Sequence, residues 1–411
     1  MARLIQSFGG VGLANDADTI TTVKYNERGN WLAAADKGGR IVLFRHGKNN
    51  NYGDARTFIP HFQFQAFEVE FDFLKSLEIN SQVNCLKFHD IPQKVALFAA
   101  NDKRITYWKI NEHEDHDCTS VESVENGNGL RVPRRSGGQA KTSAKVCRTY
   151  KNAHAYNINS LDTSKDKDIL MSADDLRVNL WNVENPSACL SYVDFKPSNM
   201  TELSEVITCA RFFPKSSNLF HISSSKGIVR VGDMRDAAIC RSYSKTFQQP
   251  DDGLSTNKGA YSELTNAITD TKVSPNELYI AVRDYMSVKI WDLRMEKEPT
   301  HNITVHDNLE PHLPDLYGSE AIFDRFEVDW SPISDTRVIT GSYNNKFYIY
   351  DVAKSSTVPT VEASTPDFSS NDGPRTKIDP KKRVLHHVFH PAGDTVAVAG
   401  LAGLHLYSLS I

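Results

Sequence analysis

Cysteine is scarce in this sequence, with six residues among 411, and no two of them form a Cys-x-x-Cys pair. Such spacing predicts neither a disulfide framework nor a zinc site, so we expect reduced, mostly buried thiols and no bound metal. Long apolar runs are missing too. No stretch approaches the roughly 20 residues of a membrane span, and residues 1–12 lack the apolar core of a signal peptide. We therefore expect a protein of the cytosol or the nucleus that does not bind a membrane.

An excess of positive charge is also missing, because 47 Lys and Arg residues face 51 Asp and Glu residues for a formal net charge of −4. This balance argues against broad nucleic-acid binding. The loops that mark nucleotide-binding proteins and serine hydrolases are absent as well, whether of Walker, Rossmann or Gly-x-Ser-x-Gly type. With 40% apolar residues the chain can still bury a large core. These features favour a protein that binds others and has no catalytic centre and no cofactor.

What the sequence does contain is a repeat: an apolar strand, a strand of small residues, a polar turn and a third strand that ends in an aromatic residue. The third strand occurs seven times, at residues 41–44, 105–108, 178–181, 229–232, 288–291, 347–350 and 404–407. Six copies end in an aromatic residue, Gly232 is the exception, and Trp291-Asp292 is the clearest Trp-Asp pair. The repeat predicts an all-β fold, a seven-bladed WD40 β-propeller that forms a single domain over residues 1–411.

The last repeat has no strand left after Leu409, so its sheet needs a fourth strand from elsewhere. Residues 5–13, at the other end of the chain, are the candidate. Pairing them with the last repeat would close the ring and leave no open sheet edge.

Three long insertions separate the repeats. Residues 54–73 contain aromatic residues in near alternation, which predicts a strand with one apolar face; we interpret the insertion as a projecting hairpin, with ordinary blade packing as the alternative. Residues 111–151 hold an acidic stretch followed by a basic one, which is typical of a solvated charged loop and, as a sharper alternative, of an electrostatic docking arm. Residues 353–383 are predicted to form a third loop.

Catalytic groupings do not stand out. His154 precedes a first strand, where WD repeats place a histidine that forms hydrogen bonds inside the blade. His386, His387 and His390 lack neighbouring cysteines or acids, and alternate residues of a strand point to opposite faces, so a metal site is not expected there. A hydrolase that uses Asp174 and Asp175 as an acid/base pair remains a distant alternative.

Seven ordered runs, spread over nearly the whole chain, are more specific than a Trp-Asp pair: DKGGR (36–40), EFDFLKSLEI (70–79), SADDLR (172–177), KPSNM (196–200), SSSKG (223–227), RDYMSVKIWD (283–292) and TGSYNN (340–345). They closely resemble the WD-repeat B-family (55 kDa) regulatory subunits of protein phosphatase 2A. The resemblance implies a non-catalytic, substrate-selecting subunit of a trimer with a HEAT-repeat scaffold and a metal-dependent serine/threonine phosphatase catalytic subunit. A generic WD40 scaffold or receptor in another complex, such as a ubiquitin ligase, is the alternative.

The resemblance also implies two sets of contact residues. The hairpin would grip the scaffold through Phe62, Phe64, Phe67, Glu70, Phe71 and Asp72. One end of the propeller would receive basic and apolar helical motifs from phosphoprotein substrates and inhibitors, through Lys37, Tyr156, Asp175, Leu176, Met200, Leu203, Glu205 and Phe323. Acidic side chains there can attract Arg or Lys, and Met200 and Leu203 offer an adaptable apolar contact. The chain departs from the family at residues 80–82, Asn157 and Gly318, so its choice of substrate stays open.

Overall fold

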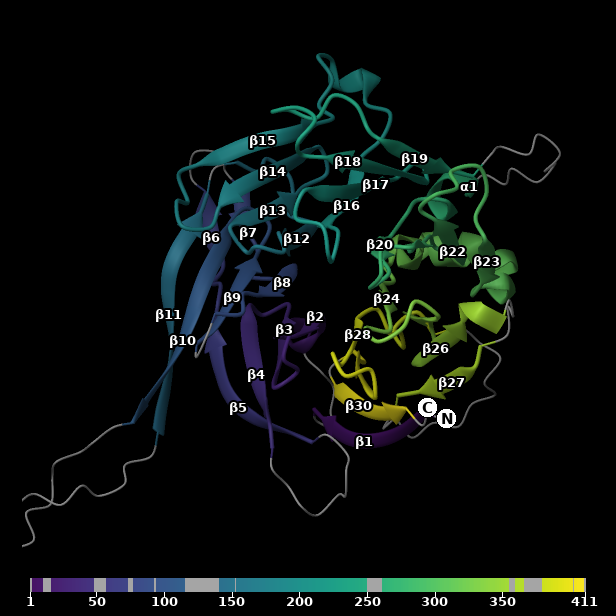
Figure 1. Cartoon of the computed structure of the whole chain (residues 1–411). Coiled ribbons are helices and arrows are strands. Elements are labelled where there is room, and N and C mark those ends of the chain that lie inside the picture. Colours follow the sequence, from purple (N-terminus) through teal and green to yellow (C-terminus); the bar gives the residue numbers. More distant parts are fainter. Residues whose placement is uncertain are drawn as a thin grey trace, which may run out of the picture.

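The computed structural model describes residues 2–9, 16–47, 57–72, 77–91, 94–114, 140–151, 153–249, 261–354, 359–365, 379–401 and 403–409. Within these ranges, seven four-stranded antiparallel sheets stand around a central axis (Figure 1). One further sheet has only two strands. The prediction of a seven-bladed β-propeller is therefore confirmed.

We number the blades from the N-terminus, and six of them take their four strands from consecutive sequence. The strands of blades 1 to 3, from the axis outward, are β2 (Ile20–Tyr25), β3 (Trp31–Asp36), β4 (Arg40–His46) and β5 (Phe58–Gln65); β8 (Cys85–Phe88), β9 (Val95–Ala100), β10 (Ile105–Glu114) and β11 (Ala140–Tyr150); β12 (Ser160–Thr163), β13 (Ile169–Ala173), β14 (Arg177–Asn182) and β15 (Cys189–Asp194).

The strands of blades 4 to 6 follow the same order: β16 (Ile207–Phe212), β17 (Leu219–Ser224), β18 (Ile228–Asp233) and β19 (Lys245–Gln248); β20 (Asp270–Val273), β21 (Tyr279–Arg283), β22 (Ser287–Asp292) and β23 (His301–Thr304); β24 (Val328–Trp330), β25 (Arg337–Gly341), β26 (Lys346–Asp351) and β27 (Val361–Ser364). Blade 7 contains β28 (His387–Phe389), β29 (Thr395–Ala399) and β30 (Leu404–Leu409), and its outer strand is β1 (Ala2–Phe8).

The apolar core lies between the blades, because both faces of each sheet are covered by its neighbours. One cluster joins Trp31 and Leu43 of blade 1 to Leu86 and Trp108 of blade 2, and similar clusters follow around the ring. Alternate residues of every inner and middle strand feed these clusters, which is why the sequence repeats small and β-branched residues.

Gly232 breaks the aromatic pattern for a packing reason. It pairs directly with Phe220 on the neighbouring strand, and a Cβ atom at Gly232 would lie 2.5 Å from the Phe220 ring. Phe220 is fully buried and packs against Tyr192 of blade 3, with 5.4 Å between ring centroids. In blade 4 the aromatic side chain has therefore moved to the neighbouring strand.

Both ends of the described chain meet in blade 7, where β1 pairs with β30 (Figure 1). The prediction that an N-terminal strand closes the ring is confirmed, although the strand covers Ala2–Phe8 and not residues 5–13. The Gln6 side chain also joins blade 7 to blade 1, since its amide donates to the Phe58 carbonyl oxygen at 3.0 Å and its oxygen accepts from the Phe58 amide at 2.7 Å. Next to it, the Ser7 hydroxyl lies 2.8 Å from His405 Nδ1.

The insertions differ from the predictions in detail. A projecting hairpin over residues 54–73 is not shown. Phe58–Gln65 is the outer strand of blade 1, and within the described part of this insertion β6 (Glu70–Asp72) is the one strand that pairs outside the blades, with β7 (Leu77–Ile79). Residues 111–151 are not simply a loop, because β10 continues to Glu114 and β11 begins at Ala140. In the segment 353–383, β27 forms the outer strand of blade 6.

Replacing Gln6 by Ala should destabilise the protein, because two part-buried backbone groups of Phe58 lose their partners. We expect a loss of about 1–3 kcal/mol in the free energy of unfolding. Arg3, exposed on the same strand, is the control, and Arg3→Ala should change stability by less than about 0.5 kcal/mol. Urea unfolding of the two variants is the measurement, and equal midpoints would contradict the role given to Gln6.

Acidification should weaken the same seam through His405. Burial lowers the pKa of His405 from 6.5 to about 4, so the unfolded chain binds this proton more readily than the folded one. The contribution to stability is complete above pH 6.5 and is lost as the pH falls towards 4, by roughly 3 kcal/mol at the folded pKa. Thermal unfolding from neutral pH to pH 4 should therefore show a shallower pH dependence in His405→Gln than in the parent. The same slope in both would rule the effect out.

Candidate partner-binding face

The loops that lead into the inner strands and the turns between the second and third strands lie at one end of the ring. Antiparallel pairing requires this, since Ser160 at the start of β12 pairs with Ala173 at the end of β13, and Ile207 pairs with Ser224 in the next blade. We call this end the upper face. All eight residues predicted to contact substrates lie in these loops and turns: Lys37, Tyr156, Asp175, Leu176, Met200, Leu203, Glu205 and Phe323.

Two of these predictions conflict with the structure. Leu176 is only 2% exposed, so it supports the turn from below and offers no surface to a partner. Glu205 is half-buried, and its carboxylate accepts two hydrogen bonds from the Arg230 guanidinium at 2.8 and 3.1 Å. The sequence places the Glu205 carboxylate near other acidic residues of this loop, but it does not indicate that Arg230 already binds this carboxylate.

The turn of blade 3 explains why Asp174 and Asp175 differ. Asp174 is fully buried; its Oδ1 accepts from the amides of Leu176 and Arg177, and its Oδ2 lies 3.0 Å from His154 Nδ1. Burial alone would raise the pKa of Asp174, but these hydrogen bonds hold it below its ordinary value. A carboxylate with every oxygen engaged cannot serve as an acid or base towards a substrate, which argues against the hydrolase alternative.

His154 is a structural residue, as its position predicted. Its Nε2 lies 2.7 Å from the Ser172 hydroxyl, which also accepts a 2.8 Å hydrogen bond from the indole of Trp181. The chain of hydrogen bonds from Asp174 through His154 and Ser172 to Trp181 fixes the turn to the blade. The neighbouring Asp175 is thereby held at the surface.

Asp175 is partly exposed, and one side of its carboxylate is anchored. Asn159 donates its amide to Asp175 Oδ1 at 2.8 Å and to the Ile207 carbonyl oxygen at 3.2 Å, while the Asn159 oxygen accepts from Arg325 at 3.0 Å. Among the described residues, no hydrogen bond occupies Asp175 Oδ2. That oxygen is available to a cation from a partner.

Apolar side chains lie on the loops that lead into the inner strands of blades 3 and 4, on either side of this turn in the sequence. Met200 opens the short 3-10 helix η3 (Met200–Glu202), which Asn199 caps by accepting from the Thr201 amide at 3.2 Å. Met200 is exposed and Leu203 is half-buried, and Tyr156 is exposed in the loop before β12. The upper face of blades 3 and 4 therefore offers apolar surface beside an anchored acid.

Phe323 is 55% exposed and belongs to a helical cap over blades 5 and 6 that sequence reasoning did not foresee. The cap consists of η4 (Asp307–His312), α2 (Leu313–Gly318) and η5 (Ala321–Phe323). Beneath it, Tyr343 accepts from the Tyr285 hydroxyl at 3.0 Å and lies 2.9 Å from Asp324 Oδ2, and Arg383 donates to the other oxygen of Asp324 at 2.5 Å. This buried network holds Phe323 and the neighbouring Tyr317 in place, with 6.1 Å between their ring centroids.

Two cavities follow the axis of the ring. The one at the upper face has a volume of about 440 Å³ and is lined by Lys37, Asn157, Arg325, Arg383 and His386, among others. The one below has a volume of about 640 Å³. Four side chains border both cavities and form a waist between them: Asn84, Asn159, Arg211 and Glu327. Asn159 thus joins the anchored acid of the upper face to the interior of the ring.

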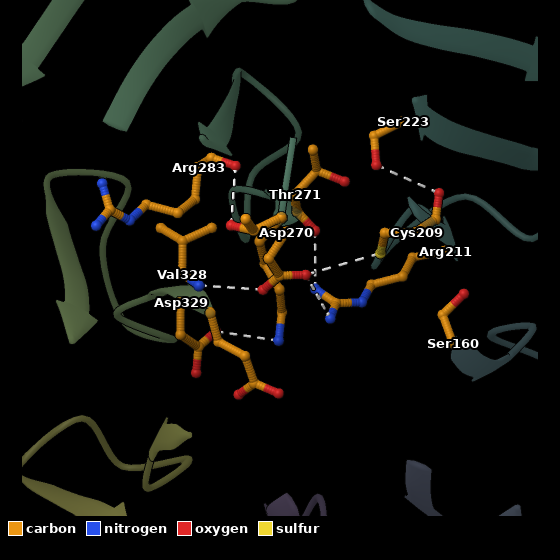
Figure 2. A network of polar contacts seen from close by, with 12 residues as sticks. Ser160, Cys209, Arg211, Ser223, Asp270, Thr271, Arg283, Val328 and Asp329 are labelled. Carbon is orange, nitrogen blue, oxygen red and sulfur yellow. Dashed lines mark hydrogen bonds and ion pairs between the residues drawn. The ribbon is translucent and has the colours of Figure 1, made fainter. Parts of the chain in front are cut away.

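A repeated contact joins the inner strands of neighbouring blades around the axis. In blades 3, 5 and 6 an inner-strand aspartate binds a cation of the preceding blade with one oxygen and accepts a backbone amide of the following blade with the other. The three sets are Lys87, Asp162 and the amide of Phe212; Arg211, Asp270 and the amide of Val328; and Lys272, Asp329 and the amide of Phe389. Figure 2 shows the second set and part of the third.

Arg211 is the most enclosed of these cations. Its guanidinium lies 2.8 Å from Asp270 Oδ1 and donates to the Thr271 carbonyl oxygen at 2.8 Å (Figure 2). Burial alone would lower the pKa of Arg211, but the Asp270 carboxylate holds it above its ordinary value. The Arg211 guanidinium therefore stays charged at neutral pH.

Replacing Arg211 by Met should leave the Asp270 carboxyl group without its cation inside the ring. We expect a loss of about 3 kcal/mol in unfolding free energy, near the lower end for breaking a buried pair, because Arg211 borders a cavity. The surface pair of Arg235 and Asp233 is the matched control, and Arg235→Gln should leave the unfolding free energy nearly unchanged because solvent screens an exposed pair. Denaturant unfolding measures both; similar losses would show that the inner pair has no special role.

The residues predicted to contact a scaffold are mostly engaged inside the protein. Phe67 is 1% exposed and Phe62 and Phe64 pack against the core between blades 1 and 2, where the Phe64 and Trp108 rings are 4.8 Å apart. Glu70 pairs with Arg104 at 2.5 Å, while Phe71 is 52% exposed. The Asp72 side chain lies outside the described part of the structure. Among the aromatic residues of this series that the structure describes, Phe71 is the one that is largely exposed.

A different projection is present in blade 2. β9 pairs with β10 only over Ile105–Ile110, whereas β10 and β11 continue to pair as far as Glu114 and Ala140. The paired ends therefore run beyond the blade, and Figure 1 shows both strands extending away from the ring. We call these paired ends, residues 111–114 and 140–143, the β10–β11 arm. The signal in the sequence was the abrupt change from acidic to basic residues, which had suggested a docking arm only as an alternative.

Within the described ranges, no group of three or more His, Cys, Asp or Glu side chains is arranged to hold a metal ion. His386, His387 and His390 instead contact Glu327, the Ile339 carbonyl oxygen and the Gly29 carbonyl oxygen respectively. None of the helices described has the length and apolar character needed to cross a membrane.

Comparisons with known proteins agree with this architecture. The family model for the WD domain, G-beta repeat, matches residues 144–182, which include β12, β13 and β14. With seven such sheets closed into a ring, the protein is a WD40 propeller. Across 420 aligned residues it is 37% identical to the "Protein phosphatase PP2A 55 kDa regulatory subunit" of Drosophila melanogaster, covering 95% of this chain and 83% of the relative. The chain belongs to the family of 55 kDa regulatory (B) subunits of protein phosphatase PP2A, which are not catalytic.

Proposed function

We propose that this regulatory subunit recruits phosphoprotein substrates and inhibitors on its upper face and presents them to the catalytic subunit of PP2A. The observation that carries the proposal is Asp175, whose Oδ1 is anchored by Asn159 while no described residue binds Oδ2, on the same face as the exposed Met200 and Tyr156. An anchored carboxylate beside apolar side chains suits a short helix with one basic residue and an apolar face. The partner would act in the cytosol or the nucleus.

The apolar contacts should supply most of the affinity. An exposed ion pair contributes about 1 kcal/mol or less, whereas burying one Leu or Met side chain contributes about 1.5–3 kcal/mol. The role of Asp175 is therefore to select a basic residue and to set its register. Phe323, held by the cap over blades 5 and 6, widens the apolar surface on the far side of the axis.

For the HEAT-repeat scaffold we propose docking through the β10–β11 arm, and not through residues 58–73. Phe62, Phe64 and Phe67 are engaged in the core and cannot leave it without opening the blade. The arm, by contrast, extends from the ring and carries paired backbone beyond the last contact with β9.

A generic WD40 scaffold is the alternative, and the similarity to one PP2A subunit over 95% of the chain argues against it. Isolation of the tagged subunit from its own cells, followed by mass spectrometry, separates the two. The proposal expects a HEAT-repeat scaffold and a phosphatase catalytic subunit to co-purify. A stable subunit that never brings down a phosphatase core would contradict it.

Two variants should separate peptide binding at the upper face from scaffold binding at the β10–β11 arm. Asp175→Lys should weaken capture of a basic, apolar helical peptide by at least about tenfold, because it replaces attraction by repulsion, while scaffold binding stays unchanged. Replacing residues 111–143 by Asn-Gly, which suits a tight hairpin turn, should abolish scaffold binding and leave peptide capture intact. Pull-down and peptide titration with both variants are the measurements. Unaltered peptide binding in Asp175→Lys would remove the proposed groove.

A further inference from the structure

Arg325 stands out in the lining of the upper cavity. The other basic side chains of that lining each contact an acid: Lys37 contacts Asp16, Arg211 contacts Asp270, Arg383 contacts Asp324 and His386 contacts Glu327. Arg325 is the one cation there that forms no ion pair within the described residues. Its guanidinium has a single hydrogen bond, to the Asn159 side-chain oxygen at 3.0 Å, and the side chain is exposed.

Arg325 is also held in a defined position. Asp324, just before it, is bound by Arg383 and Tyr343, and Phe326, just after it, is fully buried. The backbone of Arg325 is therefore anchored on both sides. Little backbone freedom therefore remains to be lost when the Arg325 side chain binds a ligand.

Asn159 stands between Arg325 and Asp175 and keeps them from pairing directly. Its amide nitrogen binds Asp175 Oδ1 at 2.8 Å and its oxygen binds Arg325 at 3.0 Å. Had the two charged groups met, each would have neutralised the other. Because the neutral amide of Asn159 lies between them, the upper face presents the Asp175 carboxylate and the Arg325 guanidinium near each other. Each has further hydrogen-bonding atoms that no described residue occupies. Asp102 is a further carboxylate of the cavity lining, and Asn84 binds it at 2.9 Å.

We propose that the upper mouth of the central cavity is an anion subsite, in which Arg325 binds a carboxylate or phosphate group of the same partner whose basic residue pairs with Asp175. The inference rests on the proposed function, since it needs Asp175 to bind a cation. The recognised motif is then bipartite, with one basic and one acidic or phosphorylated residue. Side chains three or four positions apart on a helix lie about 5–6 Å from each other on one face. One such pair can therefore reach Asp175 and Arg325, which a single amide group, that of Asn159, separates.

The test uses the full chain and a set of helical peptides that carry one Arg, two Leu and a variable residue four positions from the Arg. The variable residue is Glu, phosphoserine, Gln or Lys. We expect the Glu or phosphoserine peptide to bind about fivefold more tightly than the Gln peptide, as one exposed ion pair implies, and the Lys peptide to bind most weakly. Comparing Glu with phosphoserine identifies which source of negative charge the subsite prefers.

Arg325→Gln should abolish the difference between the anionic peptides and the Gln peptide. Lys226→Gln, which removes an exposed cation from the turn of blade 4 on the same face, is the matched control and should keep the difference. Equal binding of all four peptides to the parent, or a difference that survives in Arg325→Gln, would overturn the subsite.

Asp175→Lys separates this inference from the proposed function. If Asp175→Lys weakens every peptide but the anionic residue has no effect on the parent, only the subsite is overturned. If Asp175→Lys has no effect, or the parent binds none of the peptides, the proposed groove fails and the subsite fails with it. Preference for an anion that depends on Arg325, together with dependence on Asp175, would support both.

Discussion

The structure depends on bonds that cross from one blade to the next around the axis. A single four-stranded sheet of this size cannot bury its two faces alone, so each blade is stable only between neighbours. At the inner strands Asp162, Asp270 and Asp329 each bind a cation of the blade before and a backbone amide of the blade after. Because each carboxylate spans three blades, a local opening has to break contacts on both sides.

The ring closes by the same principle, with backbone in place of side chains. β1 completes the sheet of blade 7, and the amide of Gln6 pairs with Phe58 of blade 1 as another strand would. This arrangement leaves the first and last parts of the chain at one seam. The seam is held by polar contacts such as Ser7 with His405, so protonation of the buried His405 weakens it.

A closed ring allows the upper face to carry charges that contribute little to folding. Asp174 and Asp175 are adjacent in the chain, yet Asp174 is fully engaged with His154 and the turn amides, while Asp175 keeps one oxygen free. Because its hydrogen bonds fix Asp174, they also fix the position of Asp175 beside it. Arg325 is presented in a similar way between the anchored Asp324 and the buried Phe326.

Much of the fold could be predicted from the sequence because the propeller is a repeat. Alternating apolar residues, small-residue strands and polar turns recur in each blade, so the seven copies of the pattern predicted seven sheets. Outer strands were harder to predict, since their sides face solvent and their pattern is weak; residues 58–65 and the extended β10–β11 pair were misjudged for this reason. Local pattern also could not show that Leu176 is covered or that Arg230 occupies Glu205.

The sequence by itself therefore determined the architecture, the closing N-terminal strand and the family, because these follow from periodic local patterns and from motifs read in order. Only the tertiary structure decided which charges are free. Asn159 and Asp175 come from blade 3, whereas Arg325 follows the cap 166 residues beyond Asn159 in the chain. Whether a charged side chain is neutralised depends on which neighbour reaches it through space, and sequence spacing carries no record of that.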